Sequence, residues 1–107
     1  MNMERSYELG KILSGLEDWK EDYYVDFLNT KSFEAGIIRL RKIQEDTQST
    51  HSVDEIYNVI EGEGLIRIGG EDYEVHKGIV VFVPANTKHR FHRNIGDLIV
   101  LYVFAKE

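Results

Sequence analysis

The 107-residue sequence contains no cysteine, so the chain can form no disulfide bond, no thiolate metal site and no cysteine nucleophile. If it binds a metal ion, the strong ligands must come from His, Asp and Glu. It also lacks any apolar run near the roughly eighteen residues that a membrane-spanning helix needs. Its first 22 residues are charged throughout and show no apolar segment of a signal peptide. We therefore expect a cytoplasmic protein without a membrane partner.

Basic residues are in the minority, with 13 Lys and Arg against 19 Asp and Glu and a formal net charge of −6. The longest basic stretch runs only from Arg39 to Lys42. Nucleic acid is therefore not an expected partner. Apolar residues make up 42% of the chain and aromatic residues 11%, which is typical of a folded globular protein. A chain of this length predicts a single domain over residues 1–107, with a helical extension (1–22) before a β-barrel (23–107).

The one proline and six of the nine glycines divide the second half of the chain into short segments. Leu9, Ile12, Leu13 and Leu16 have helical spacing and predict one short amphipathic helix over residues 7–16, lying on the outside of the fold. After it, the pattern predicts strands at about 23–29, 32–34, 36–43, 56–60, 64–69, 72–75, 79–83, 88–93 and 97–104. The predicted class is all-β, an antiparallel barrel or jelly roll.

Two turns can be predicted in more detail from their residue types. Gly69-Gly70 is a two-residue hairpin signal, because such a loop needs a positive φ that glycine adopts without strain. Pro84 has no N–H for a strand ladder and should end the strand before it. Asn86 then stands at a tight turn, and asparagine enters the left-handed region readily.

Candidate metal ligands occur in two of these segments. His51 and Glu55 lie just before and at the start of one predicted strand, and His89 lies in the turn-rich stretch that follows Pro84. Neutral imidazoles and an ionised carboxylate are a ligand set for zinc or for a redox-active iron with open positions. The same three residues could instead form a buried hydrogen-bond network.

Two stretches around these residues resemble the two signatures of the cupin superfamily. The stretch HSVDEIYNVIEGEG resembles the first signature, with His51 at its second histidine and Glu55 at its glutamate. The stretch GIVVFVPANTKHRFHRN resembles the second, with Pro84 and His89 at matching positions. The resemblance covers residues 36–104 and implies a cupin-type β-barrel, a double-stranded jelly roll. Ser49 stands where the first signature has its first histidine.

The resemblance implies a divalent metal ion, Fe, Mn, Ni or Zn, held by His51, Glu55 and His89 with open positions for water or substrate. Gln48 could supply a fourth, neutral oxygen ligand. Strand alternation places Tyr57 on the same face as Glu55, as a proton donor or as an aromatic wall. Arg41, like Arg39, could hold a substrate carboxylate or simply belong to a solvated sheet face.

Two functions of different classes remain open at this point. The first is a metal-dependent enzyme acting on a small organic molecule, of the dioxygenase, isomerase or lyase type. The second is a non-catalytic module that binds or senses a small molecule. For either, we expect a homodimer, because a short barrel has edge strands to protect and Val25 and Phe27 are apolar residues that precede the barrel proper.

Overall fold

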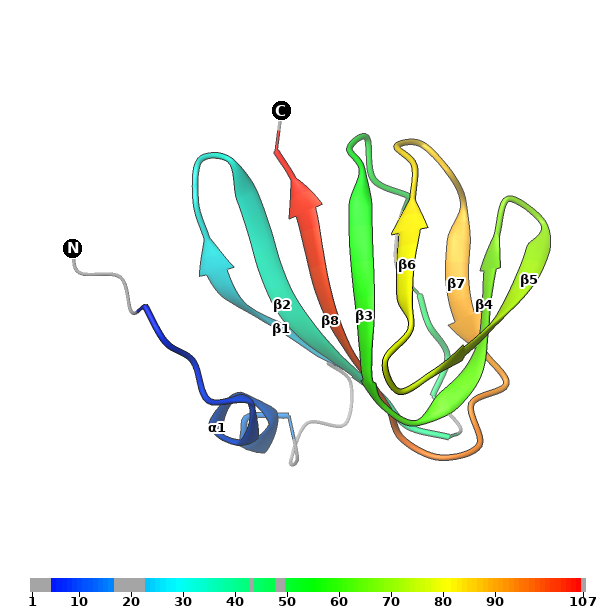
Figure 1. Cartoon of the computed structure of the whole chain (residues 1–107), viewed down its shortest axis with the longest axis horizontal. Coiled ribbons are helices and arrows are strands. Elements are labelled where there is room, and N and C mark those ends of the chain that lie inside the picture. Colours follow the sequence, from blue (N-terminus) through cyan, green and yellow to red (C-terminus); the bar gives the residue numbers. More distant parts are fainter. Residues whose placement is uncertain (1–4, 17–22, 43, 48–49, 107) are drawn as a thin grey trace.

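The computed structural model describes residues 5–16, 23–42, 44–47 and 50–106. Figure 1 shows their arrangement, with one helix at the N-terminal end and strands making up most of the rest. The elements are α1 (Leu9–Ser14), β1 (Tyr24–Asn29), β2 (Phe33–Leu40), β3 (Glu55–Glu61), β4 (Glu63–Ile68), β5 (Glu71–His76), β6 (Val80–Val83), β7 (His89–His92) and β8 (Leu98–Ala105).

These strands form two antiparallel sheets, one of five strands in the order β1-β2-β8-β3-β6 and one of three in the order β5-β4-β7. The prediction of an all-β antiparallel fold with a short N-terminal helix is confirmed. The helix is shorter than the predicted 7–16, because Glu8 before it is extended and Gly15 is its C-cap residue. Among the described residues, no helix is both long and apolar enough to cross a membrane.

The predicted strands at 32–34 and 36–43 are one continuous strand, β2, which ends at Leu40. Gly36 does not break it, because Gly36 pairs directly with Tyr102 of β8 and leaves room for the tyrosine ring above the sheet. A Cβ atom at position 36 would overlap the Tyr102 hydroxyl group. Glycine is thus required here by a close approach within the sheet and not by a turn.

The predicted turns are present. Gly69 and Gly70 connect β4 to β5 with φ of 57° and 95°, and Asn86 has φ of 62° after the strand that ends before Pro84. The backbone N–H of Asn86 donates to the carbonyl oxygen of His51 over 2.7 Å. This bond joins the loop after β6 to the segment before β3, which brings the two histidine-bearing parts of the chain together.

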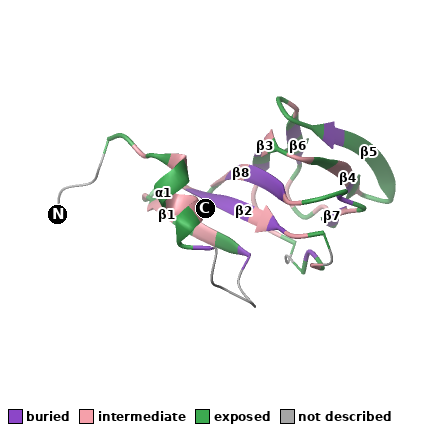
Figure 2. Ribbon diagram, turned by 90° about the horizontal axis from the view of Figure 1, so that it is seen from below, coloured by how far each residue is buried: buried purple, intermediate pink, exposed green. Residues whose placement is uncertain are grey.

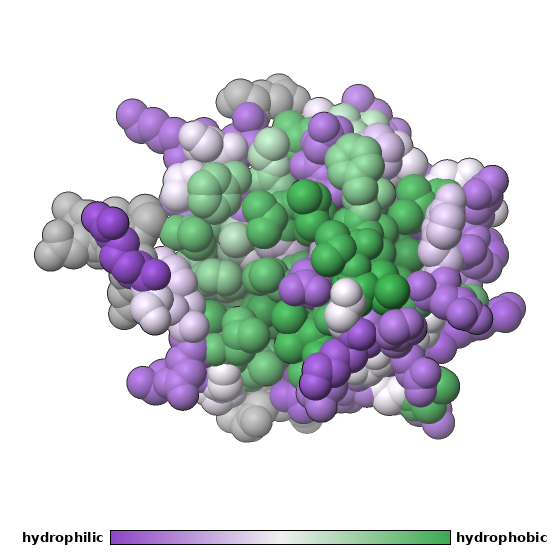
Figure 3. Space-filling model, in the orientation of Figure 1, coloured by the Kyte–Doolittle hydropathy of each residue, from purple (hydrophilic) through white to green (hydrophobic). Residues whose placement is uncertain are grey.

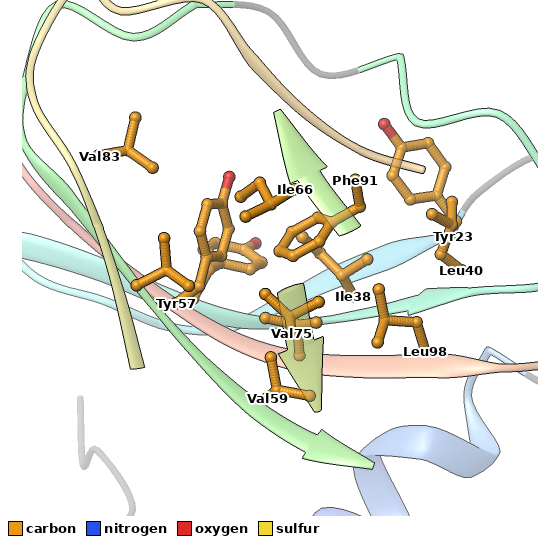
Figure 4. Packing of buried hydrophobic residues seen from close by; sticks show 13 residues of the cluster. Tyr23, Ile38, Leu40, Tyr57, Val59, Ile66, Val75, Val83, Phe91 and Leu98 are labelled. Atoms are coloured by element: carbon orange, nitrogen blue, oxygen red, sulfur yellow. The ribbon is translucent and has the colours of Figure 1, made fainter. Parts of the chain in front are cut away.

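The main core lies between the two sheets. Figure 4 shows its buried side chains meeting from both sheets, and Figure 2 shows the buried segments along the strands. The cluster consists of Tyr23, Ile38, Leu40, Tyr57, Val59, Ile66, Val75, Val81, Val83, Phe91, Leu98, Val100 and Tyr102. Alternate residues of β3 and β6 are buried, as a strand with one face on a core requires.

The opposite face of the five-stranded sheet is also apolar. Part of it packs under α1 in a second cluster that contains Leu16, Ile37 and Ile99, so the helix lies on the outside of the fold as predicted. Beyond the helix, Ile56 and Phe82 remain 48% and 57% exposed. Figure 3 shows apolar side chains gathered over the middle of this view of the molecule.

Candidate functional site

Three polar side chains lie at one end of the main core. Glu55 and Tyr57 come from alternate positions on the inward face of β3, and His89 is the first residue of β7 in the other sheet. They are 2%, 0% and 6% exposed. Burial of an ionisable carboxyl group to this extent is costly unless partners compensate for the lost water, so the contacts of this group decide what it can do.

The Tyr57 hydroxyl group joins the other two residues. It donates to Glu55 Oε1 over 3.0 Å, and its oxygen also lies 3.0 Å from His89 Nε2. His89 Nε2 is 3.3 Å from the same Glu55 oxygen. The three residues thus form a closed triangle of polar contacts inside an apolar core.

The tautomer of His89 follows from its second ring nitrogen. Nδ1 lies 2.8 Å from the carbonyl oxygen of Thr87, which can only accept, so Nδ1 carries a hydrogen. The neutral ring then presents the lone pair of Nε2 to the cluster. The single hydroxyl hydrogen of Tyr57 faces two acceptors, Nε2 and Glu55 Oε1, which leaves one acceptor for a further proton or a cation.

The acid–base balance of His89 reflects these contacts. Burial disfavours the charged ring, but the hydrogen bonds with the Glu55 carboxylate and the Thr87 carbonyl outweigh it, so the pKa of His89 is raised above its ordinary value. A positive charge at this position is therefore favoured by the protein around it.

His51 lies beside the triangle, at the surface. Its side chain is 30% exposed, and Nε2 is 3.9 Å from Glu55 Oε1. The imidazole ring stacks on Phe104, with ring centroids 4.8 Å apart and planes 15° apart. The structure thus brings His51, Glu55, Tyr57 and His89 close to one another.

The donor set can be tested for a metal ion. Metal–ligand bonds of about 2.1 Å place neighbouring ligand atoms about 3 Å apart. The pair formed by His89 and Glu55 is near that spacing, at 3.3 Å, whereas His51 is farther from Glu55, at 3.9 Å. Within the described ranges, no three His, Asp or Glu side chains are arranged closely enough to hold a metal ion as they stand. Gln48 and Ser49 lie outside the described residues.

One atom nevertheless suits a metal ligand. Glu55 Oε2 is buried and has no hydrogen-bond partner among the described residues. A buried carboxylate oxygen without a donor is costly, and a metal ion would satisfy it. The chemistry of the two imidazoles and the carboxylate therefore fits a divalent ion, with His51 as the ligand that has to move closer.

A pocket of about 270 Å³ opens beside this cluster. The residues that line it are Tyr24, Glu34, Thr47, His51, Glu55, Tyr102 and Phe104. The sequence did not single out Tyr24, Glu34, Tyr102 or Phe104, because they reach the site only through the pairing of β1 with β2, β2 with β8 and β8 with β3. The one local signal for these residues was the alternation along their strands. In the structure, Phe104 lies directly opposite Glu55, and Tyr102 lies directly opposite Tyr57, in the pairing of β8 with β3.

The two arginines considered from the sequence lie elsewhere. Arg39 pairs with Asp97, with Nη2 2.9 Å from Oδ2. Arg41 donates from Nη2 to the carbonyl oxygen of Leu16 over 2.9 Å. Neither lines the pocket. The structure thus places the guanidinium group of Arg41 against the helical extension, where it anchors that segment.

Comparison with known proteins places this architecture in a family. The family model of the cupin domain matches residues 36–105. Over 82 residues the chain is 39% identical to the uncharacterized protein SCO3923 of Streptomyces coelicolor, covering 77% of this chain and 78% of that protein. The chain belongs to the cupin family.

Solved structures share the fold. TT1209 from Thermus thermophilus superposes with a TM-score of 0.77 at 19% identity and covers 95% of this chain and 97% of its own. An RmlC-like cupin from Shewanella frigidimarina gives a TM-score of 0.70 at 20% identity, covering 78% of this chain and 75% of its own. At this level of identity the likeness establishes the fold, and the chemistry has to be argued from the site.

Proposed function

We propose that this cupin binds a divalent metal ion through His51, Glu55 and His89 and uses it to act on a small organic molecule in the adjoining pocket. The observation that supports this most is the buried Glu55 Oε2 without a partner among the described residues, next to an imidazole whose Nε2 is directed at the same carboxylate. The Thr87 carbonyl fixes the His89 ring through Nδ1, which is the kind of support that metal-binding histidines have. Gln48 is the proposed fourth ligand.

In this function the metal ion supplies Lewis acidity or, if it is iron, redox chemistry of the dioxygenase type; isomerase and lyase reactions need only the Lewis acid. The protein supplies the surroundings. Glu55 and His89 are buried and keep water from the inner side, whereas half-exposed His51 stands where the pocket opens. The Tyr57 hydroxyl group holds Glu55 and His89 at a fixed separation and can pass a proton between them.

The second candidate is a non-catalytic module that binds a small molecule. It is favoured by the position of the Tyr57 hydroxyl group, which links Glu55 directly to His89. In this function the triangle is a structural network under a binding pocket, and a proton on His89 supplies the positive charge.

Elemental analysis separates the two. Protein purified without a metal-binding tag is incubated with iron, manganese, nickel or zinc, desalted and analysed for metal. We expect one ion per chain in the wild type and a sharp loss in His51→Ala, Glu55→Gln and His89→Ala, because each removes a large part of a small ligand set. His76→Ala is the matched control, since His76 is exposed on β5 and its ring contacts the neighbouring carbonyl oxygen of Lys77, away from the pocket.

Tyr57→Phe provides a second test. If Tyr57 only supports the metal ligands, this variant keeps its metal ion. If the triangle is a structural network, Tyr57→Phe loses about 1–3 kcal/mol of unfolding free energy, because Glu55 and His89 lose the buried hydroxyl group that links them. A wild type that carries no ion after all four incubations would remove the metal function and leave the binding module.

A further inference from the structure

The pocket beside the metal-ligand cluster has a charge that selects its ligand. We propose that it accepts an organic cation, a group of the ammonium type, and excludes carboxylates. The inference rests on the proposed function, because it concerns the small molecule that would lie next to the metal ion.

The first support is the sign of the ionisable groups. Glu34 and Glu55 both line the pocket, and the described part of its lining includes no lysine or arginine. Lys106, just after β8, donates its ammonium group to the side-chain oxygen of Asn29 instead of turning inward. The described lining thus presents two carboxylates, with the imidazole of His51 as a basic side chain but no lysine or arginine.

Aromatic rings provide the second support. Tyr102 and Phe104 stack with planes 9° apart and centroids 5.8 Å apart, and His51 also stacks on Phe104. Tyr24, 53% exposed, adds a further ring to the lining. The faces of phenol and benzene rings carry negative charge and attract cations, whereas they repel carboxylates.

The third support comes from buried oxygen atoms that lack a hydrogen-bond partner among the described residues. The Tyr102 hydroxyl group is buried, the residue being 4% exposed, and it has no hydrogen-bond partner among the described residues. Glu55 also lines the pocket, and its Oε2 atom is likewise buried without a hydrogen-bond partner among the described residues. The Tyr102 oxygen is therefore an acceptor for the polarised hydrogens of a ligand, and Glu55 Oε2 is a second acceptor in chelator-treated protein.

The surroundings of Tyr102 indicate the local potential. Burial, followed by the Glu34 and Asp26 carboxylates, raises the pKa of Tyr102 well above its ordinary range. The same charges that disfavour a phenolate here would disfavour any other anion and favour a cation.

A bound metal ion does not reverse this preference. A divalent ion and the Glu55 carboxylate together carry one positive charge, and Glu34 and Asp26 carry two negative charges. The neighbourhood stays negative by one charge, which one ammonium group balances. The cation is therefore expected beside Glu34 and Tyr102, away from the ligand atoms of His51 and His89.

The test compares three ligands. The first is choline, and the second is its uncharged isostere, in which carbon replaces the quaternary nitrogen and so makes a tert-butyl group. The third is a carboxylate that carries the tert-butyl group of this isostere. The nitrogen of choline has no lone pair, so it cannot bind a metal ion and mimic the expected result. Binding is followed by NMR titration of amide resonances, with those of Thr47 and Phe104 as reporters of the pocket, in chelator-treated and in metal-loaded protein. We expect choline to bind about tenfold more tightly than its isostere, and the carboxylate more weakly than either.

Glu34→Gln should remove most of the preference for choline. Glu61→Gln is the matched control, because it makes the same change of charge at an exposed position at the other end of β3 and should leave the preference intact. The inference is overturned if the isostere or the carboxylate binds as tightly as choline, if none of the three shifts the pocket resonances, or if Glu61→Gln has the same effect as Glu34→Gln.

The two proposals can fail separately. Normal metal uptake without a preference for choline refutes the cation pocket alone. A preference for choline in a protein that takes up no metal ion refutes the metal function and leaves the cation pocket to the binding module.

Discussion

Replacing Gly36 by alanine tests the arrangement that shapes the pocket. Gly36 lies in the middle of β2, opposite Tyr102, and a Cβ atom there would overlap the Tyr102 hydroxyl group and approach the Val25 carbonyl oxygen to 2.5 Å. The Tyr102 ring is confined by burial and by its stacking on Phe104. The Val25 carbonyl belongs to β1 and is confined by the pairing of β1 with β2. The Val25 carbonyl group can yield only if β1 moves, and the Tyr102 ring can yield only by giving up its buried packing.

Overpacking of this kind costs about 1–3 kcal/mol, and because two confined groups are affected we expect Gly36→Ala to lose about 3 kcal/mol of unfolding free energy. Urea unfolding at a fixed protein concentration measures it. Gly96→Ala is the matched control, since no atom lies within 4 Å of the added Cβ, and its stability should be unchanged or slightly higher.

A double-mutant cycle assigns the loss to its source. Tyr102→Ala removes the ring that the methyl group added by Gly36→Ala would strike, so the double variant should be about 1–2 kcal/mol more stable than the sum of the two single changes predicts. A Gly36→Ala protein within about 0.5 kcal/mol of wild type, or strictly additive losses, would refute the reasoning.

Three further predictions concern other parts of the molecule. Asp46→Ala should lose about 2–4 kcal/mol of unfolding free energy, because Asp46 Oδ2 accepts the buried backbone N–H of Phe91 over 2.8 Å; a loss in urea unfolding no larger than that of a surface substitution would contradict this. Hydrogen bonds from Arg67, then from His92, hold the pKa of exposed Asp72 well below its usual range. This carboxylate therefore stabilises the fold above about pH 4 and progressively less on acidification. Asp72→Asn should be less stable than wild type at neutral pH, and the difference in unfolding free energy should shrink in acid. A difference that stays constant with pH would exclude the effect. Light scattering should give a dimer through the outer face of the five-stranded sheet, and Phe82→Glu should give a monomer, because Phe82 is 57% exposed on that face; a monomeric wild type would rule the dimer out.

The elements of this fold could be predicted from local sequence to a large extent. The glycine pair at 69–70 and the asparagine at 86 have the positive φ values that their residue types allow, and the strands of the second half begin and end within about two residues of the predicted bounds. These features depend on the preferences of single residues and on period-two alternation, which act over a few positions. The two histidine-bearing segments could be assigned to one site because their spacing resembles the family signatures.

Other features depend on strands that pair across the whole chain. β2 pairs with β8, about sixty residues away in the sequence, and this pairing determines that Gly36 faces Tyr102 and that Glu34 and Phe104 line the pocket. Neither the strand order nor the register is specified by local propensity, since side chains along one strand are equally consistent with several partners. Arg41 is a second example. The alternation of side chains along its strand allowed it a place in the cavity, but its guanidinium group contacts Leu16. The sequence by itself determined the strands, the turns and the candidate ligands, whereas the tertiary structure decided which side chains surround those ligands and with what charge, because only long-range pairing brings them together.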